Sequence, residues 1–201
     1  MNFITEFSTL IKIGCPIIGI ITTEEQRFAN LLKKIFSEKD HFLWTSHLGL
    51  VGKEENIYPI EANEAIKKFS TRDEKVYIWL KITENLMEEK NFIRALKDEY
   101  YHLKGRNRFI ILSSSNFAIP EELIGEIQIL RLPPPDENEI QNIIESFFRS
   151  ANLSFSPMTT AHAVAILKGL KQSEIEFSLK KALLSLKEKG LKGNGSWNQS
   201  Q

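Results

Sequence analysis

The junction between an apolar strand and an amphipathic helix near the amino terminus carries the residues with the clearest chemical meaning. Residues 16–21 (PIIGII) are typical of a buried strand, and the residues after the junction have helical spacing. A junction that binds nucleotide phosphates carries G-x-x-x-x-G-K-[ST], because backbone N–H groups and a lysine must surround the phosphate. The junction here has the sequence Thr22-Thr23-Glu24-Glu25. Two carboxylates therefore stand where a phosphate would bind, and no Lys-Ser/Thr pair follows them.

The same residues also have a purely structural interpretation, as the start of a helix. A threonine hydroxyl can accept a hydrogen bond from the first turn, and a Glu or Gln three residues later can reach back to the capping residue. We therefore expect Thr22 and Thr23 to be N-cap residues, with Glu25 and Gln26 as their capping-box partners. We favour this interpretation over a catalytic role for the glutamates.

The acidic pair that phosphoryl transfer needs after the third strand is also missing. In such a pair one carboxylate holds Mg²⁺ and the other polarises water. Residues 76–80 (VYIWL) have the character of that strand, but Lys81 and Ile82 follow it. Glu84 lies two residues further on, and we interpret it as a solvated or capping glutamate. We therefore predict no metal site here.

Asn116 is a polar residue that follows the predicted fourth strand. We expect it to form a turn, or to cap a helix that begins near Pro120. No arginine lies in residues 109–130, where an arginine finger would be expected. Phosphoryl transfer depends on such groups for positioning and charge neutralisation. We therefore predict no catalytic residue, no ATPase activity and no bound cofactor.

Other kinds of chemistry have little support in the sequence. The four histidines are scattered and have no metal-ligand spacing; they are His41, His47, His102 and His162. No G-x-S-x-G elbow of a serine hydrolase is present. Cys15 adjoins an apolar strand and is expected to be a small buried hydrophobe. Lys104, Arg106 and Arg108 form a basic segment that we interpret as a solvated loop, since three charges bind a phosphate backbone only weakly.

The composition limits the class of protein. The chain has 201 residues, of which 42% are hydrophobic and thirteen are Phe, so it can build a real core. Lys+Arg and Asp+Glu are both 26, so bulk attraction to nucleic acid or to a membrane is not expected, although a local patch is compatible with this balance. There is no secretory signal and no run of about 18 apolar residues that could span a bilayer. These features predict a cytoplasmic location.

Strands alternate with helices through the first two thirds of the chain. The predicted strands are residues 16–21, 41–45, 76–80, 109–112 and 127–132. The predicted helices are an initial one containing Phe3, Phe7, Leu10 and Ile11, and then residues 24–36, 61–69 and 86–103, with residues 46–60 as a loop. This alternation predicts an α/β three-layer sandwich with five parallel strands and helices on both faces of the sheet.

The pattern changes after Pro133-Pro134-Pro135, where only helices are predicted. Asp136 can cap the first of them, Ser156-Pro157 can begin the second, and Ser173 with Glu176 forms a capping box for the last. We therefore divide the chain into an α/β domain over residues 1–135, a small helical lid over 136–190 and a flexible tail over 191–201.

Three segments resemble parts of the AAA+ ATPase module, in which a five-stranded parallel sheet is followed by a helical lid. RLPPPDENEIQNII is similar to the exit of the last strand into the lid, LSSSNFAIPEEL to the sensor-1 segment, and LKGLKQSEIEFSLKKAL to the lid itself. By this resemblance Thr22–Glu25 would be a degenerate Walker A motif, Lys81, Ile82 and Glu84 a degenerate Walker B motif, and Asn116 the sensor residue.

Over residues 5–190 the chain more specifically resembles the amino-terminal half of the AAA ATPase family named for a hypothetical chloroplast reading frame, found in plastids and cyanobacteria. The segments FSTLIKIGCPIIGIITTEEQR and WLKITENLMEEKNFIRALKDEYYHLKGRNRFIILSSSNFAIPEEL carry this resemblance. It implies a degenerate AAA+ domain without a P-loop, which an active ATPase domain follows in the family. It also adds the plastid stroma as a location.

We interpret the chain as a catalytically inactive AAA+-like domain with a structural or regulatory role. Its expected partner is an AAA+ ATPase domain or a second copy of itself, with no membrane or nucleic-acid partner. One alternative is a nucleotide-binding protein that holds ATP and Mg²⁺ in a non-standard pocket between sheet and lid. A second alternative is a clamp-loader-like subunit that helps to hold nucleic acid.

Overall fold

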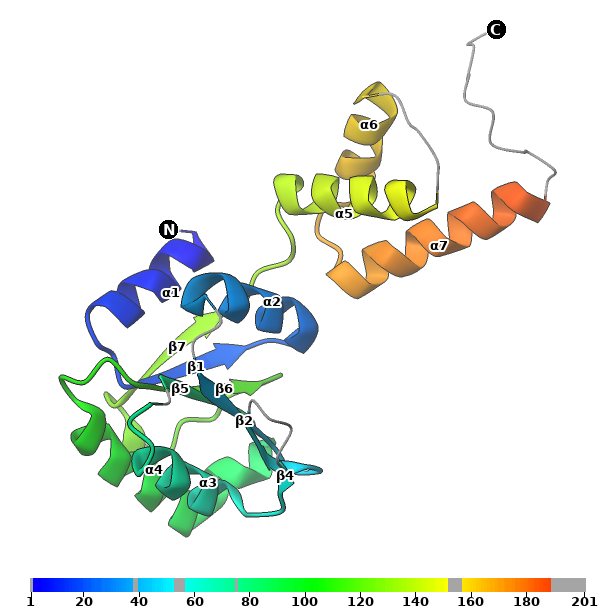
Figure 1. Ribbon diagram of the computed structural model, residues 1–201. Helices are drawn as coiled ribbons and strands as arrows, with labels where there is room; N and C mark the ends of the chain where they lie inside the picture. Colours follow the sequence, from blue (N-terminus) through cyan, green and yellow to red (C-terminus); the bar gives the residue numbers. More distant parts are fainter. Residues whose placement is uncertain (1, 38–39, 53–56, 75, 152–156, 189–201) are drawn as a thin grey trace, which may run out of the picture. The chain divides into compact units, whose positions relative to one another are not determined.

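The computed structural model describes residues 2–37, 40–52, 57–74, 76–151 and 157–188 (Figure 1). Its contacts divide the chain into two compact units, Met1–Leu132 and Pro133–Gln201, and each unit is described here by itself. The tail predicted over residues 191–201 lies outside the described residues.

The first unit is built on one seven-stranded sheet with the order β4-β3-β2-β5-β6-β1-β7. The strands are β1 Ile17–Ile21, β2 His41–Thr45, β3 Gly49–Val51, β4 Ile57–Tyr58, β5 Tyr77–Lys81, β6 Phe109–Ser114 and β7 Ile127–Arg131. Five of these strands are parallel, as predicted, and they form the continuous series β2-β5-β6-β1-β7. The predicted α/β class and its five parallel strands are therefore confirmed.

The other two strands correct the prediction that residues 46–60 are a loop. β3 pairs antiparallel with β2, and β4 pairs antiparallel with β3. Gly49, which lies within the predicted loop, begins β3 with a φ of 72°. A Cβ atom at this position would lie 2.2 Å from the carbonyl oxygen of Tyr58, so the two strands approach too closely for any side chain at Gly49.

Helices cover both faces of the sheet, which gives the three layers seen in Figure 1. One face packs against α1 (Phe3–Lys12) and α2 (Glu25–Phe36), and the other against α3 (Ala62–Ser70) and α4 (Lys90–Leu103). Successive strand residues point to opposite faces, so Ile18 and Ile20 join the cluster under α1 and α2 while Ile17 joins the opposite cluster. Both faces are thus buried, as a parallel sheet requires.

The helix predicted over residues 86–103 is two elements in the structure. A short 3₁₀ helix, η1, spans Glu84–Glu88, and α4 begins at Lys90. Glu89 between them has an extended backbone, with φ −77° and ψ 114°. The break lets the adjacent side chains of Leu86 and Met87 both enter the core.

The second unit consists of helices α5 (Glu137–Ser150), α6 (Pro157–Leu167) and α7 (Gln172–Glu188) around a small apolar core. Asp136 caps α5 as predicted, because its carboxylate accepts the N–H of Glu139 while the Glu139 carboxylate accepts the N–H of Asp136. Ser156 lies outside the described residues.

The capping box predicted from Ser173 and Glu176 is wrong. Helix α7 begins at Gln172, so Ser173 lies inside its first turn. The backbone N–H of Lys171 donates to the Glu174 carboxylate at 2.8 Å. The N3 residue of the motif is therefore Glu174, two positions earlier than the sequence pattern indicated.

Candidate functional site

A cavity of about 450 Å³ lies at the carboxyl ends of β1, β5 and β6. Its lining residues are Thr22, Thr23, Glu25, Ile82, Thr83, Ser114 and Ser115. The register explains this gathering, because Ile21 at the end of β1 pairs with Ser114 of β6, and Lys81 at the end of β5 pairs with Ser113. Open parallel sheets bind their ligands outside this edge, and the volume is in the usual range for a small-molecule site.

An ion pair joins Glu25 and Lys81, and at each position a nucleotide site would need a group of the opposite charge. Lys81 Nζ lies 2.9 Å from Glu25 Oε2, with the two side chains 27% and 45% exposed. Lys81 also lies over the indole ring of Trp79, 4.8 Å from its centroid. The carboxylate at the phosphate position and the amine at the Mg²⁺ position thus neutralise each other across the sheet edge.

The predicted capping box at the start of α2 is wrong. Thr22 Oγ1 accepts the backbone N–H of Glu24 at 2.9 Å, which is a local turn two residues long. The N–H of Thr22 itself bonds to the carbonyl of Ser114, so Thr22 still extends the β1–β6 pairing and stands too early to cap the helix. The N-cap residue is Glu24, and its side chain makes no capping hydrogen bond.

Sequence reasoning missed Arg27 as a residue of this junction. Its side chain is only 7% exposed, and its guanidinium donates to the Glu24 carboxylate at 3.2 Å. The opposite charges three residues apart on a helix are the signal that could have indicated this pair. Glu24 is therefore a structural partner of Arg27, and the carboxylate that faces the cavity is that of Glu25.

The segment around Asn116 also differs from the prediction. Ser113 and Ser114, predicted as loop, are the buried last residues of β6, and Ser113 Oγ accepts the indole N–H of Trp79 at 2.9 Å. Asn116 is exposed, and its backbone N–H donates to Ser114 Oγ at 3.4 Å in a local turn, which is one of its two predicted roles. It does not cap a helix, because the helix near Pro120 is the short η2 (Glu121–Leu123), whose N-cap is Pro120. Glu84 is the first residue of η1, and its side chain lies outside the described part of the structure.

The basic segment before β6 is only partly a solvated loop. Lys104 and Arg106 are exposed, but Arg108 is buried. Its guanidinium donates to the carbonyl oxygens of Phe69, Ser70 and Arg72 at the end of α3. Desolvation lowers the pKa of Arg108, and the nearby Asp73 carboxylate opposes this change. Arg108 therefore fixes α3 to the sheet rather than facing a ligand.

Three further findings concern the described residues only. No group of three or more His, Cys, Asp or Glu side chains in the described part could hold a metal ion. Cys15 is partly buried, and burial raises the pKa of its thiol. None of the described helices is long and apolar enough to cross a membrane.

Comparison with protein families matches residues 3–132 to the family described as SpoVK-like AAA ATPase, N-terminal domain. Similar proteins include the uncharacterized AAA domain-containing proteins ycf46 of Guillardia theta and Trieres chinensis. The first is 27% identical over 196 residues, covering 94% of this chain and 38% of the relative. The second is 27% identical over 195 residues, covering 93% and 39%. The chain thus spans less than half the length of these relatives.

Two solved structures show the same fold at low sequence identity. Domain III of the replication initiation protein DnaA from Thermotoga maritima has a TM-score of 0.53 and 13% identity, covering 93% of this chain and 82% of that one. The AAA domain of FIGL-1 in complex with ADP has a TM-score of 0.60 and 9% identity, covering 88% and 62%. These likenesses concern the fold alone.

Proposed function

We propose that this chain, which belongs to the family of SpoVK-like AAA ATPase N-terminal domains, is a non-catalytic AAA+-like domain. Its role is structural or regulatory, and it acts by packing on an AAA+ ATPase domain or on another copy of itself. It neither binds nor hydrolyses ATP at the carboxyl edge of its sheet.

The ion pair between Glu25 and Lys81 is the observation that carries this proposal. A triphosphate needs cationic groups and free N–H donors at the start of the helix after β1, and Mg²⁺ needs carboxylates after the third parallel strand. Here Glu25 would repel the phosphates and Lys81 would repel the metal ion. Each charge instead satisfies the other, so a nucleotide would have to break the pair before it could enter the cavity.

The second unit supports a role in association. Phe177 is 69% exposed and Leu184 is 61% exposed, and they lie two turns apart on one face of α7. Lys180 and Lys181 flank them and are also exposed. The core of the unit uses the opposite face of α7, through Ile175 and Leu179. An apolar face with a charged border is typical of a protein contact surface.

The relatives favour an AAA domain as the partner. They are more than twice as long as this chain, and their names describe them as AAA domain-containing proteins. The part of each relative that this chain does not span is therefore a source of candidate partner domains.

Calorimetric titration of the whole chain with Mg-ATP tests the proposal. We expect no binding tighter than about millimolar, because none of the described residues that line the cavity is a cation. A Glu25→Gln variant removes the repelling carboxylate and releases Lys81. We expect it to gain detectable affinity for ATP while the exposed-residue control Glu121→Gln binds no better than the wild type.

One outcome would replace the proposal with the second candidate function, nucleotide binding at a non-standard site. The volume of the cavity and its Thr and Ser hydroxyl groups favour that candidate. Wild-type binding in the micromolar range that is lost in Lys81→Ala, with the circular dichroism spectrum unchanged, would establish it. Equal binding by both proteins would place any nucleotide elsewhere.

A further inference from the structure

The order of the central strands places three loops side by side at the edge of the sheet opposite the cavity. Ile17 of β1 pairs with Ile110 of β6 on one side and with Ile127 of β7 on the other. The loops through which the chain enters these strands are residues 12–16, 104–108 and 124–126. We call these three loops the amino-terminal edge.

Each loop of the amino-terminal edge turns at a glycine with positive φ and projects into open space. The φ angles are 73° at Gly14, 80° at Gly105 and 95° at Gly125. A Cβ atom built at any of the three would meet no atom within 4 Å. A side chain at any of these three positions would therefore enter open space, so each turn lies at the surface of the unit.

The turns display apolar side chains. Ile13 is 71% exposed and Ile124 is 67% exposed, which makes them the two most exposed large hydrophobic residues among those described in the first unit. Tyr101, at the end of α4 and just before the middle loop, is 60% exposed. Each isoleucine immediately precedes its turn glycine, so the tight turn holds it away from the core.

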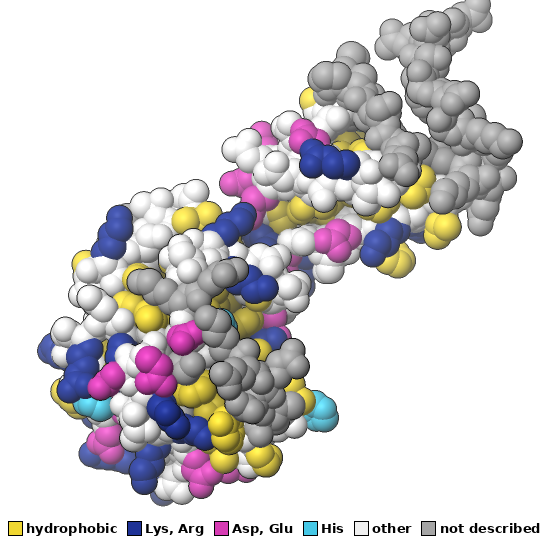
Figure 2. Space-filling model, in the orientation of Figure 1, with side chains coloured by type: hydrophobic (Ala, Val, Ile, Leu, Met, Phe, Trp, Pro, Cys, Tyr) yellow, Lys and Arg dark blue, Asp and Glu magenta, His cyan; other side chains and the backbone are white. Residues whose placement is uncertain are grey.

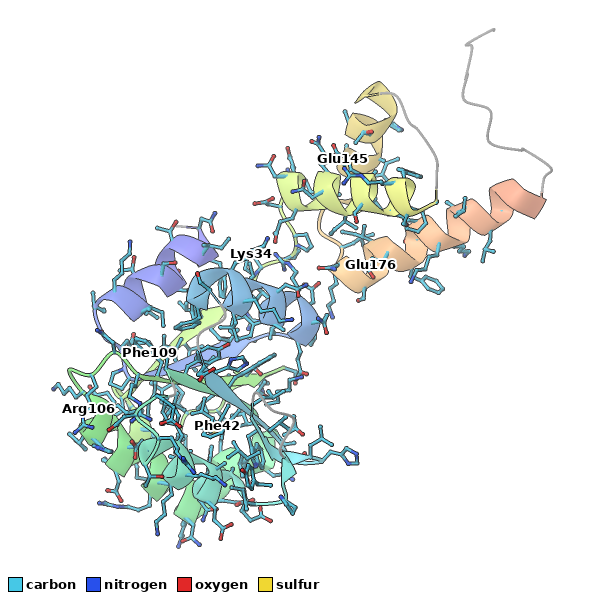
Figure 3. All side chains as sticks on the ribbon, in the orientation of Figure 1. Lys34, Phe42, Arg106, Phe109, Glu145 and Glu176 are labelled. Carbon is cyan, nitrogen blue, oxygen red and sulfur yellow. The ribbon has the colours of Figure 1, made fainter. Side chains whose placement is uncertain are left out.

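Cationic side chains accompany the apolar ones. Lys12, Lys104 and Arg106 are exposed, and among the described residues no carboxylate forms an ion pair with any of them. In Figure 3 the labelled Arg106 lies near the labelled Phe109, the first residue of β6, at the left side of the unit. Two exposed glutamates of η2, Glu121 and Glu122, precede Ile124. Glu126, in the third loop, lies 4.0 Å from Lys97 and is balanced by it, so the three exposed cations leave the patch with a small positive excess.

We propose that the amino-terminal edge docks peripherally on an anionic lipid surface. Isoleucine tips can enter the boundary between headgroups and acyl chains, tyrosine suits the interface, and each lysine or arginine attracts anionic headgroups. A nucleic-acid backbone would use the cations but gives the two isoleucines no apolar environment. This contact depends on a local patch, so the zero net charge of the chain does not oppose it.

Co-sedimentation of the whole chain with vesicles tests this proposal. The vesicles contain phosphatidylcholine alone or with about one third phosphatidylglycerol, at low and moderate salt. We expect weak binding that requires the anionic lipid and falls as salt rises. The variant Lys104→Gln/Arg106→Gln should bind about 25-fold less at low salt, because each charge near the surface contributes about fivefold.

The apolar part of the contact is tested by Ile13→Ser/Ile124→Ser, which should bind about tenfold less at every salt concentration. The matched controls are Ile166→Ser on α6 and Lys33→Gln/Lys34→Gln on α2, which should bind as the wild type does. All replaced side chains are exposed, and circular dichroism checks that each variant is folded.

Two results would overturn the proposal. The first is equal sedimentation with neutral and anionic vesicles, or an equal loss in the edge variants and their controls. The second is a loss in the charge variant with no loss in the isoleucine variant, combined with salt-dependent binding of a short fluorescent duplex. That pattern would show that the cationic side chains bind nucleic acid rather than lipid.

Discussion

At the scale of single residues, Arg108 shows how a charged side chain in a basic segment becomes part of the core. Its guanidinium satisfies carbonyl oxygens at the end of α3 and lies 4.3 Å from the ring centroid of Phe69. Its ion pair with Asp73 contributes little, because the Asp73 side chain is 86% exposed. The stabilisation therefore comes from the hydrogen bonds that the buried guanidinium donates to backbone carbonyl oxygens.

We predict that Arg108→Ala lowers the free energy of unfolding by about 3 kcal/mol, because it removes a buried guanidinium that donates to the carbonyl oxygens of Ser70 and Arg72 and adds a bond to that of Phe69. Arg106→Ala, two residues away and exposed, should change it by less than about 0.5 kcal/mol. Urea unfolding followed by circular dichroism measures both. A cost for Arg108→Ala no larger than that of its neighbour would show that these hydrogen bonds do not hold α3 in place.

The residues of the candidate site could be identified from the sequence, but their pairing could not. The positions of Glu25 and Lys81 follow from counting along predicted strands and helices. Their contact depends on the strand order, in which β6 lies between β5 and β1, and on the direction in which α2 leaves the sheet edge. A single sequence shows which chemical group stands at each position. Without the strand order, it does not show which of these groups come into contact.

At the scale of elements, the long apolar strands were predicted well and the short ones were missed. β1, β5 and β6 are near-continuous apolar runs, which is the pattern of strands buried on both faces, and β2 and β7 each have three apolar residues of five. β3 has three residues and β4 has two, so neither is long enough to show a two-residue period. The capping boxes predicted for α2 and α7 were wrong because a shift of one or two positions in a helix start changes the partner, whereas the cap at Asp136 was predicted correctly.

We predict that Gly49→Ala lowers the free energy of unfolding by clearly more than Gly14→Ala. Both glycines have φ near 72°, so an alanine costs about 1 kcal/mol in backbone strain at either position. Only at Gly49 would the new Cβ atom also collide with a backbone carbonyl, whereas at Gly14 it would meet open space. The difference between the two urea midpoints therefore measures how rigidly β3 and β4 are paired. Equal midpoints would show that β3 and β4 can move apart to admit the new Cβ atom at little cost in free energy.

At the scale of the whole molecule, the surface carries no single strong charge. Figure 2 shows basic and acidic side chains interspersed on the visible faces, with hydrophobic side chains between them, which agrees with 26 residues of each sign. Long-range repulsion therefore does not oppose association between copies. Specific contact must come from local features such as the exposed face of α7, a feature that the sequence analysis did not separate from the core of the helix.

The last prediction is that the chain associates through this face of α7, with itself weakly or with the AAA domain of a relative. The charged border of the contact would include Lys180 and Lys181, and Lys171 and Glu174 at the start of the helix. The variant Phe177→Ser/Leu184→Ser should weaken the association at least about tenfold, because two large apolar side chains no longer leave water on contact. Ile4→Ser, which changes an exposed isoleucine of α1, is the matched control.

Sedimentation velocity over a range of concentrations measures self-association. Retention on a column that carries the part of the Guillardia theta relative not spanned by this chain measures binding to the remainder of that AAA domain-containing protein. The α7 variant should lose what the wild type shows, and the control should keep it. A wild-type chain that stays monomeric and is not retained, at low and at moderate salt, would contradict the proposed role. If the α7 variant still associates, the proposed role stands, but the contact is made by another surface.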